Sequence, residues 1–368
     1  MYALIDCNNF FVSCERVFRP ELQHMPVAVL SNNDGCIISR SNEVKDLGIA
    51  MGIPLFQVKS LVRQHRISLF SANFELYGDL SQRIVTLLRE ITPLIEVYSI
   101  DECFLDLSQL NIQDYEQWGK QARARIMSEI GIPVSIGVAP TKTLAKVAST
   151  FAKKHGGAYV VSDEAHRQTL VNMLPIGEVW GIGRRMAPKL KDKGVSYAGQ
   201  LLAASDAWLK QQFNIAGMRM VRELRGEACL PFGDKEDARK SIMRSRSFGH
   251  NVRAINQLES AVATFAAQAA TRLRSQDSLC STVAVFLSTG KHAAQQKRVS
   301  TVIKLSEETC DTGRIISAAI EGLTNIYDPD FAYQKAGVIL LAITSIDSWQ
   351  LSLINEETCR DERVGLMQ

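Results

Sequence analysis

The chain has 368 residues, of which 46% are hydrophobic and 22% charged, the proportions of a globular protein and not of a disordered or fibrous one. A single core rarely grows so large, so we expect two to four domains. No apolar run approaches the roughly 20 residues that a membrane span needs. The N-terminus, MYALIDCNNFF, has no basic start typical of a signal or transit peptide. We therefore expect a cytoplasmic protein with no membrane partner.

The charge is unevenly distributed, although the net charge is only +3. Residues 1–110 contain 9 Lys and Arg against 13 Asp and Glu, whereas residues 142–255 contain 20 against 10. An acidic half beside a basic segment is typical of a site that holds cations next to a surface that holds a polyanion. A solvated basic face would have the same composition. The 8 cysteines have no C-x-x-C spacing, which favours buried thiols over a zinc site.

The first 155 residues contain elements in an informative order. A short apolar strand at 2–6 ends on an acid, and 14–74 is rich in turn residues, with one short helix near 41–47. Apolar residues at helical spacing predict helices at 76–92 and 115–130, and a third helix starts at Thr141. Strands are expected at 95–99, 103–107 and 134–139. This order predicts a split βαβ, ferredoxin-like domain with its helices on one face of an antiparallel sheet, interrupted by an insertion.

Sequence patterns in the second half of the chain predict a helix-hairpin-helix region and a further domain. Residues 174–193 contain a short helix, the turn Gly181-Ile182-Gly183 and a basic second helix, which together indicate a helix-hairpin-helix within a helical stretch to about 227. The polar stretch 231–243 is expected to be a linker. Beyond it, alternating strand and helix patterns predict a separate small α+β domain, followed by a tail. The expected strands are 283–287, 300–305 and 338–343, and the expected helices are 256–275 and 313–325.

Three acidic residues are the candidate catalytic groups. Asp6 ends the first strand, and Asp101 and Glu102 lie at the turn of a strand pair that would lie beside it. Adjacent carboxylates repel each other unless cations neutralise them, and Mg²⁺ prefers such oxygen ligands. Two Mg²⁺ ions held there would serve an in-line displacement at phosphorus. Ordinary turn acids are the alternative, since Asp is common where strands end.

Candidate contacts for phosphate groups lie in two places. Ser39 and Lys45 fall in the insertion, and Lys153 ends the helix after the last strand of the first domain. The turn at Gly181 and Gly183 exposes backbone N–H groups. It is followed by a cluster of basic side chains that favours binding to a nucleic-acid backbone, namely Arg184, Arg185 and Lys189. Solvated surface lysines and arginines remain the alternative for each of them.

The motifs resemble those of Y-family DNA polymerases, and within them the UmuC subgroup. The resemblance covers nearly the whole chain. It rests on Asp6 with Phe10-Phe11, SNNDGC at 31–36, SIDE at 99–102, GVAPTKTLAK at 137–146, SRSFG at 245–249 and YQKAGV at 333–338. It implies a palm at 1–13 and 75–165, fingers at 14–74, a helix-hairpin-helix thumb at 166–235, a little finger at 241–346 and a tail at 347–368.

The resemblance also implies roles for individual residues. It makes Asp6, Asp101 and Glu102 ligands of two Mg²⁺ ions, with the backbone carbonyl of Cys7 as a further oxygen. It makes Phe11 the steric gate against ribonucleotides, with Phe10 as its neighbour. It gives the remaining nucleotide contacts to Ile38 over the base pair and to three residues at the triphosphate, Ser39, Lys45 and Lys153. Two positions depart from relatives: many have Arg in place of Lys45, and some have an aromatic residue in place of Asn9.

The implied function is template-directed DNA synthesis on damaged templates in SOS repair and mutagenesis. The implied partners are primer–template DNA, deoxynucleoside triphosphates, a UmuD′-type dimer and a recombinase filament. A nucleotidyl cyclase or metal nuclease on a similar palm, and an inactive scaffold, are the alternatives. The tail contains a peptide that resembles a sliding-clamp motif, although a chance match that packs on the little finger would look the same. Its residues are Gln350, Leu351, Leu353 and Ile354.

Overall fold

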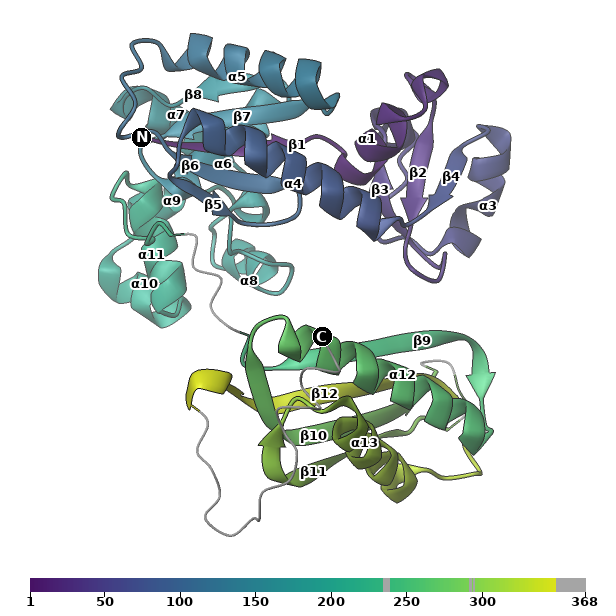
Figure 1. Ribbon diagram of the computed structural model, residues 1–368. Helices are drawn as coiled ribbons and strands as arrows, with labels where there is room; N and C mark the ends of the chain where they lie inside the picture. The colour runs from purple at the N-terminus through teal and green to yellow at the C-terminus, as the bar shows by residue number, and fades with distance from the viewer. Residues whose placement is uncertain (234–238, 291–292, 294, 349–368) are drawn as a thin grey trace. The chain divides into compact units, whose positions relative to one another are not determined.

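The computed structural model describes residues 1–233, 239–290, 293 and 295–348. Contacts divide the chain into two compact units, residues 1–235 and 236–368, which are described separately (Figure 1). Within the described ranges, no helix is both long enough and apolar enough to cross a bilayer. Five of the described cysteines are buried, as the sequence predicts, while Cys36 and Cys229 are half-buried.

The first unit is built on a five-stranded sheet with the order β5-β6-β1-β7-β8. Strand β1 lies in the middle and pairs antiparallel with both β6 and β7, whereas β7 and β8 are parallel. This order confirms the ferredoxin-like prediction and adds β8, which the sequence reasoning did not include. The strands are β1 (Tyr2–Cys7), β5 (Ile95–Val97), β6 (Glu102–Asp106), β7 (Val134–Ala139) and β8 (Ala158–Val160).

Helices cover both faces of this sheet, so the prediction of helices on one face is wrong. The long helices α4 (Phe74–Ile91) and α5 (Tyr115–Ile130) pack on one face with the side chains of Ile5 and Ile136. Helix α6 (Lys142–Ala152) packs on the other face, with Leu4 (Figure 1). The physical reason is that β1, β6 and β7 are apolar on both sides, so each side must be covered.

Helix α6 lies unusually close to the sheet because β7 contains Gly137. A Cβ atom at Gly137 would lie 2.2 Å from the carbonyl oxygen of Ala145 and 2.2 Å from the backbone nitrogen of Ser149. No side chain fits in that space, so glycine permits the close approach. The helix starts at Thr141, whose hydroxyl accepts a hydrogen bond from the backbone N–H of Leu144. Both features fix the position of α6 beside β1.

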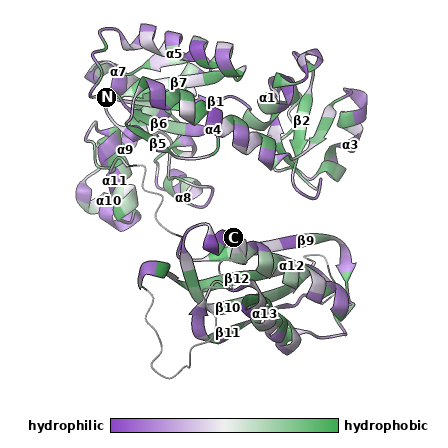
Figure 2. Cartoon of the chain, viewed as in Figure 1, coloured by the Kyte–Doolittle hydropathy of each residue, from purple (hydrophilic) through white to green (hydrophobic). Residues whose placement is uncertain are grey.

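The insertion at 14–74 is more regular than the sequence suggests. Only one short helix was predicted there, and α2 (Asn42–Asp46) confirms it, but the rest of the insertion folds around a small sheet with the order β3-β2-β4. Strand β2, drawn in the hydrophobic colour in Figure 2, is buried throughout. These strands were not predicted because they are short and are surrounded by turn residues. The other elements are α1 (Phe10–Val17), η1 (Pro20–Leu22), β2 (Val27–Leu30), β3 (Ile37–Arg40), α3 (Leu55–Gln64) and β4 (Ser68–Ser71).

A helical region completes the first unit and contains the predicted hairpin. The short η2 (Ile176–Glu178) and α8 (Met186–Asp192) flank the turn at Gly181, which has a φ of 90°. That positive φ is a conformation glycine adopts without strain. Apolar side chains of the region join α6 in one core. Its remaining helices are α7 (Glu164–Met173), α9 (Gly199–Leu202), α10 (Asp206–Gln212) and α11 (Ile215–Leu224).

The second unit is a four-stranded antiparallel sheet, with the order β11-β10-β12-β9, that carries two helices. The predicted helices and three predicted strands are all present. Strand β9 was missed because its charged side chains alternate without an apolar run. The elements are β9 (Ile242–Val252), α12 (Ile255–Arg274), β10 (Ser278–Thr289), β11 (Arg298–Thr309), α13 (Thr312–Ile326), β12 (Tyr333–Ser345) and η3 (Ile346–Ser348).

Candidate active site

The candidate carboxylates gather at one end of the central strands. Asp6 and Glu102 are direct partners in the β1–β6 ladder, and Asp101 precedes Glu102. The backbone N–H of Cys7 donates to the carbonyl oxygen of Asp101, with 2.8 Å between nitrogen and oxygen, which fixes the turn against β1. Because side chains alternate along a strand, Asp6 shares the face of Leu4, the face that α6 covers. The sheet register therefore brings together residues that are 95 positions apart in the chain.

Two lysines of the α6 segment form ion pairs with these carboxylates. The Nζ atom of Lys153 lies 2.8 Å from Oδ2 of Asp6, and the Nζ atom of Lys146 lies 2.7 Å from each oxygen of Glu102. Asp101 instead accepts a hydrogen bond from the hydroxyl of Ser99, with 2.6 Å between the oxygens. The sequence identified Lys153, but it gave no role to Lys146, whose only signal was its place in the 137–146 motif.

The environment of Asp6 changes the pKa of its carboxyl group. Burial raises the pKa of Asp6 above its usual value, the ammonium of Lys153 lowers it, and the charges of Glu102 and Asp101 raise it further. Three nearby carboxylates repel one another, and a bound cation relieves that repulsion by neutralising their charge.

The donor set at this edge fits a hard divalent cation. Each of the two ladder carboxylates holds an ammonium group, so each already takes a cation as its partner. Oxygen ligands of this kind suit Mg²⁺. As the side chains stand, however, no group of three acidic, histidine or cysteine residues within the described ranges is close enough to hold an ion. The two lysines would therefore have to release the carboxylates before an ion could bind.

Two of the predicted phosphate contacts, Lys45 and Lys153, lie near Asp6. Burial lowers the pKa of Lys45, and the positive charges of Lys153 and Arg40 lower it further, whereas Asp6 raises it. Lys45 on α2 is thus within electrostatic range of Lys153 at the end of α6. Ser39 is buried, and its hydroxyl lies 3.4 Å from the backbone nitrogen of Val12, so it contributes to the packing of the insertion on α1.

The predicted gate residue lies in an aromatic cluster. The half-buried ring of Phe11 stacks on the ring of Tyr77, with 4.6 Å between centroids and 17° between planes, and it meets the edge of Phe74 at 5.7 Å. Tyr77 is fully buried, and its hydroxyl donates to Oε1 of Glu15, with 2.8 Å between the oxygens. Phe10 is a core residue at 3% exposure. The supporting role of Tyr77 was not visible in the sequence, where it is one of several positions in α4.

Asn9, the second departure from relatives, has a local structural role. Its backbone is left-handed, with a φ of 49°, a conformation that asparagine adopts more readily than most residues. Its side-chain amide donates to Oδ1 of Asn42 at the start of α2, with 3.0 Å between nitrogen and oxygen. Asn9 therefore links the end of β1 to the helix that carries Lys45.

Comparisons with known proteins identify the family of the chain. The chain matches the impB/mucB/samB family over residues 5–150, the IMS family HHH motif over 164–195 and the impB/mucB/samB family C-terminal domain over 239–353. It is 40% identical to Protein UmuC of Salmonella typhimurium over 100% of this chain and 89% of that protein. It is 30% identical to DNA polymerase IV 1 of Bacillus subtilis over 77% of this chain and 69% of that protein. The chain belongs to the UmuC family of Y-family DNA polymerases.

Solved structures of Y-family polymerases have the same fold. A Y-family DNA polymerase chimera of Dbh and Dpo4 matches with a TM-score of 0.76 and 22% identity, over 94% of this chain and 99% of that chain. An insertion ternary complex of Dbh DNA polymerase matches with a TM-score of 0.61 and 20% identity, over 94% of this chain and 99% of that chain. The predicted multidomain fold of a Y-family DNA polymerase is therefore confirmed, and the family's terms for its parts are used below.

The thumb hairpin presents the basic side chains that the sequence singled out. Gly181 and Gly183 are exposed, and a Cβ atom at either position would meet nothing within 4 Å. Three exposed cations follow, two before α8 and one in its last turn: Arg184, Arg185 and Lys189. The hairpin thus offers open backbone and positive charge together, as contact with a nucleic-acid backbone requires.

Two further predictions have different outcomes. Ile38 is half-buried on β3 and packs against the core that contains Phe10, so one side of it remains accessible. The clamp-motif residues lie outside the described residues, so their prediction stays untested. These residues are Gln350, Leu351, Leu353 and Ile354.

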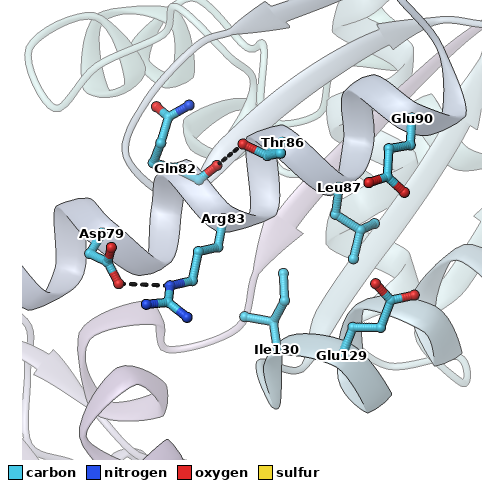
Figure 3. Close-up of a pocket in the computed structure, with 8 residues that line it drawn as sticks. All are labelled: Asp79, Gln82, Arg83, Thr86, Leu87, Glu90, Glu129 and Ile130. Atoms are coloured by element: carbon cyan, nitrogen blue, oxygen red, sulfur yellow. Dashed lines mark hydrogen bonds and ion pairs between the residues drawn. The ribbon is translucent and has the colours of Figure 1, made fainter.

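A cavity of about 300 Å³ is lined by residues other than the candidate carboxylates and lysines. It lies between α4 and the end of α5, on the face of the sheet opposite to α6 (Figure 3). Its charged groups are already paired, because Asp79 binds Arg83, and Arg125 binds both Glu90 and Glu129. This groove offers no unpartnered cation or anion to a nucleotide.

Proposed function

We propose that this chain is a template-directed DNA polymerase whose active site is formed by Asp6, Asp101 and Glu102. The proposed reaction is attack of a primer 3′-oxygen on the α-phosphorus of a deoxynucleoside triphosphate, with release of pyrophosphate. The observation that supports it most is the cross-strand pair of Asp6 and Glu102, with the phosphate-binding candidates Lys153 and Lys45 beside it. Family membership supports translesion synthesis in SOS mutagenesis as the setting of this reaction.

The carboxylates would hold two Mg²⁺ ions, with the backbone carbonyl of Cys7 as an additional oxygen ligand. When bound, the ions lower the charge barrier between the attacking and leaving oxygens at phosphorus. The protein's own contribution is to place the ligands, because the β1–β6 register fixes Asp6 against Glu102 and the turn at Ser99 fixes Asp101. Such preorganisation reduces the rearrangement that the reaction needs.

The cationic side chains would bind the triphosphate. Lys153 would exchange the Asp6 carboxylate for a phosphate oxygen, and Lys45 would neutralise a second one. Lys45 is exposed on α2, where a phosphate oxygen could reach its ammonium group. Ser39 would support the fingers or donate its hydroxyl to a phosphate, and Ile38 would cover the nascent base pair.

Phe11 would select the sugar. Its ring is held by Tyr77 and Phe74, so it cannot easily move aside for a 2′-hydroxyl group. A rigid hydrophobic wall excludes a bulky polar substituent by steric overlap and by leaving the hydroxyl without a hydrogen-bond partner. Discrimination against ribonucleotides therefore depends on the ring and on the residues that hold it.

Primer–template DNA would bind through its phosphates at the thumb hairpin. Gly181 and Gly183 supply backbone N–H groups, and the neighbouring Arg184, Arg185 and Lys189 supply charge. Such contacts carry no base information, which is appropriate for an enzyme that must accept many templates. We place this activity in the cytoplasm, where bacterial DNA is replicated.

The proposed protein partners follow the family. A UmuD′-type dimer and a recombinase filament are proposed from the similarity to Protein UmuC alone, without assigned binding residues. A sliding clamp is proposed from the tail peptide Gln350–Ile354. Tethering to a clamp would raise the local concentration of primer ends without a new contact to DNA.

A primer-extension assay with Mg²⁺ tests the activity on intact and abasic templates. The parent should lengthen the primer, whereas a metal nuclease would shorten it and a cyclase would leave it unchanged. Asp6→Asn and Asp101→Asn should each abolish extension but bind primer–template DNA as the parent does, because the basic thumb supplies DNA affinity. Asp79→Asn, at an exposed ion pair on the opposite face of the sheet, is the matched control and should extend normally. Extension by Asp6→Asn at the parent rate would refute the assignment.

A further inference from the structure

Lys146 is a half-buried cation beside the candidate carboxylates, and the proposed reaction gives it no role. Its Nζ atom lies 2.7 Å from both oxygens of Glu102, and it also lies over two aromatic rings. The distance from Nζ to the ring centroid is 4.9 Å for Tyr98 and 5.7 Å for Trp180. Both rings are within the range of a cation–π contact. The ammonium group thus has a carboxylate and two ring faces as alternative partners.

The same rings hold the start of the thumb hairpin against the palm. The indole N–H of Trp180 donates to the hydroxyl of Tyr98, with 3.0 Å between nitrogen and oxygen. The indole also packs against Phe104 of β6, with 5.8 Å between ring centroids. Trp180 directly precedes Gly181, the first residue of the hairpin turn. Any shift of the Lys146 ammonium relative to these rings therefore acts at the base of the hairpin.

The backbone of Lys146 cannot shift with its side chain. Gly137 lets α6 pack directly against β7. The thumb also fixes the start of α6, because the buried carboxylate of Glu223 accepts from the backbone N–H of Thr143, with 3.0 Å between nitrogen and oxygen. The hydroxyl of Thr141 donates to the carbonyl oxygen of Glu223. The side chain of Lys146 is thus the mobile part of an otherwise fixed junction between palm and thumb.

We propose that Lys146 is a positioning residue that holds Glu102 in the free enzyme and couples cation binding at Glu102 to the thumb through Trp180. A divalent cation that approaches both oxygens of Glu102 repels the ammonium, since like charges at such distances are strongly unfavourable. Lys146 then leaves the carboxylate and keeps only the Tyr98 and Trp180 rings, over which it already lies, as partners. The proposal depends on the assignment of Glu102 as a metal ligand in the proposed function.

The test uses the full chain without DNA or nucleotide. Trp118, Trp208 and Trp349 are replaced by Phe, so that the emission comes from Trp180 alone. Mg²⁺ is titrated while the emission is followed, and Mn²⁺ affinity is measured separately from the paramagnetic resonance of free Mn²⁺. Neither readout requires catalysis. The variants are Lys146→Met, which keeps the chain length without the charge, Lys146→Arg, which keeps the charge, and Lys154→Met, an exposed control at the end of the same helix.

The parent, Lys146→Arg and Lys154→Met should all show a change in Trp180 emission when Mg²⁺ is added. Lys146→Met should show none, because it has no ammonium group over the indole that a bound cation could displace. Its Mn²⁺ affinity should rise by about fivefold, since a competing ion pair with partly buried partners is worth the upper end of what exposed pairs contribute. Glu102→Gln should weaken Mn²⁺ binding.

Two results would overturn the proposal, and only the second would also overturn the assignment of Glu102 as a metal ligand. Equal Mn²⁺ affinity and an equal emission change in the parent and Lys146→Met would remove the coupling but leave the metal site intact. Unchanged Mn²⁺ affinity in Glu102→Gln, or no Mn²⁺ binding by the parent, would remove the metal assignment and the coupling with it. Primer extension by the parent separates this second result from a failure of the polymerase activity itself.

Discussion

The stacking of Phe11 on Tyr77 provides a sharp test of the sugar gate. Tyr77 has two separable interactions, the face-to-face stack with Phe11 and the hydrogen bond from its hydroxyl to Glu15. Tyr77→Leu keeps much of the buried volume but removes the stack. Tyr77→Phe keeps the stack and removes only the hydroxyl. Comparing the two variants therefore isolates the contribution of the stack to ribonucleotide discrimination.

The size of the effect follows from the energy of an aromatic pair. A stacked pair contributes about 0.5–1.5 kcal/mol beyond the area that it buries. If that energy keeps the Phe11 ring in place, its loss lowers discrimination against ribonucleotides by about two- to twelvefold, since about 1.4 kcal/mol is a factor of ten. Tyr77→Phe should leave discrimination unchanged. It should cost about 1–3 kcal/mol of folding stability, because one oxygen of the buried Glu15 loses its partner.

The assay is single-turnover incorporation of a matched deoxynucleotide and of the corresponding ribonucleotide, each at saturating concentration. Phe11→Ala gives the full loss of the gate, and Tyr77→Leu in that background should add nothing further. Retention of parental discrimination by Tyr77→Leu, while Phe11→Ala loses it, would refute the supporting role of Tyr77. Unchanged discrimination in Phe11→Ala would refute the gate itself. An equal loss in Tyr77→Phe and Tyr77→Leu would mean that the hydroxyl, and not the stack, holds the ring.

Three further predictions concern other parts of the chain. Replacing Arg184 and Arg185 by Ala should weaken DNA binding on all sequences alike and reduce the slope of log K against log salt by roughly one unit per lost phosphate contact; a sequence-selective loss would contradict this. Replacing 350–354 by alanines should leave primer extension unchanged without a clamp and abolish its stimulation by a loaded clamp; equal stimulation would make the segment a simple tail. Burial raises the pKa of Cys280 to about 12, so at pH 8 it stays a protonated thiol and should resist iodoacetamide until the protein is unfolded in urea; rapid modification of the native protein, followed by mass spectrometry, would contradict its burial.

The sequence alone was sufficient wherever a local pattern carries the structure. The apolar positions of α4 and α5 recur at helical spacing, and the predicted strand 134–139 matches β7 to the residue. The order of these elements predicted the ferredoxin-like sheet. The motifs around Asp6 and Asp101 then indicated the family, which the comparisons confirmed.

Local patterns failed where the structure depends on distant partners. The insertion was predicted to be largely irregular because β2, β3 and β4 are short and separated by turns, and only their pairing makes a sheet. Strand β9 is exposed along most of its length and is stabilised by its ladder with β12. Helices were expected on one face because the ferredoxin-like order places them there, although the apolar side chains on both sides of β1 require cover on each face.

In the active site, the sequence supplied the acids, and the tertiary structure supplied their partners. Asp6 and Glu102 could be expected to meet because the ferredoxin-like order places β1 beside β6. That Lys153 binds Asp6 and Lys146 binds Glu102 follows only from the close packing of α6 on β7, which the absence of a side chain at Gly137 permits. No periodicity encodes a contact between residues 147 positions apart, because such a contact is decided by the packing of whole elements and not by the neighbours of either residue.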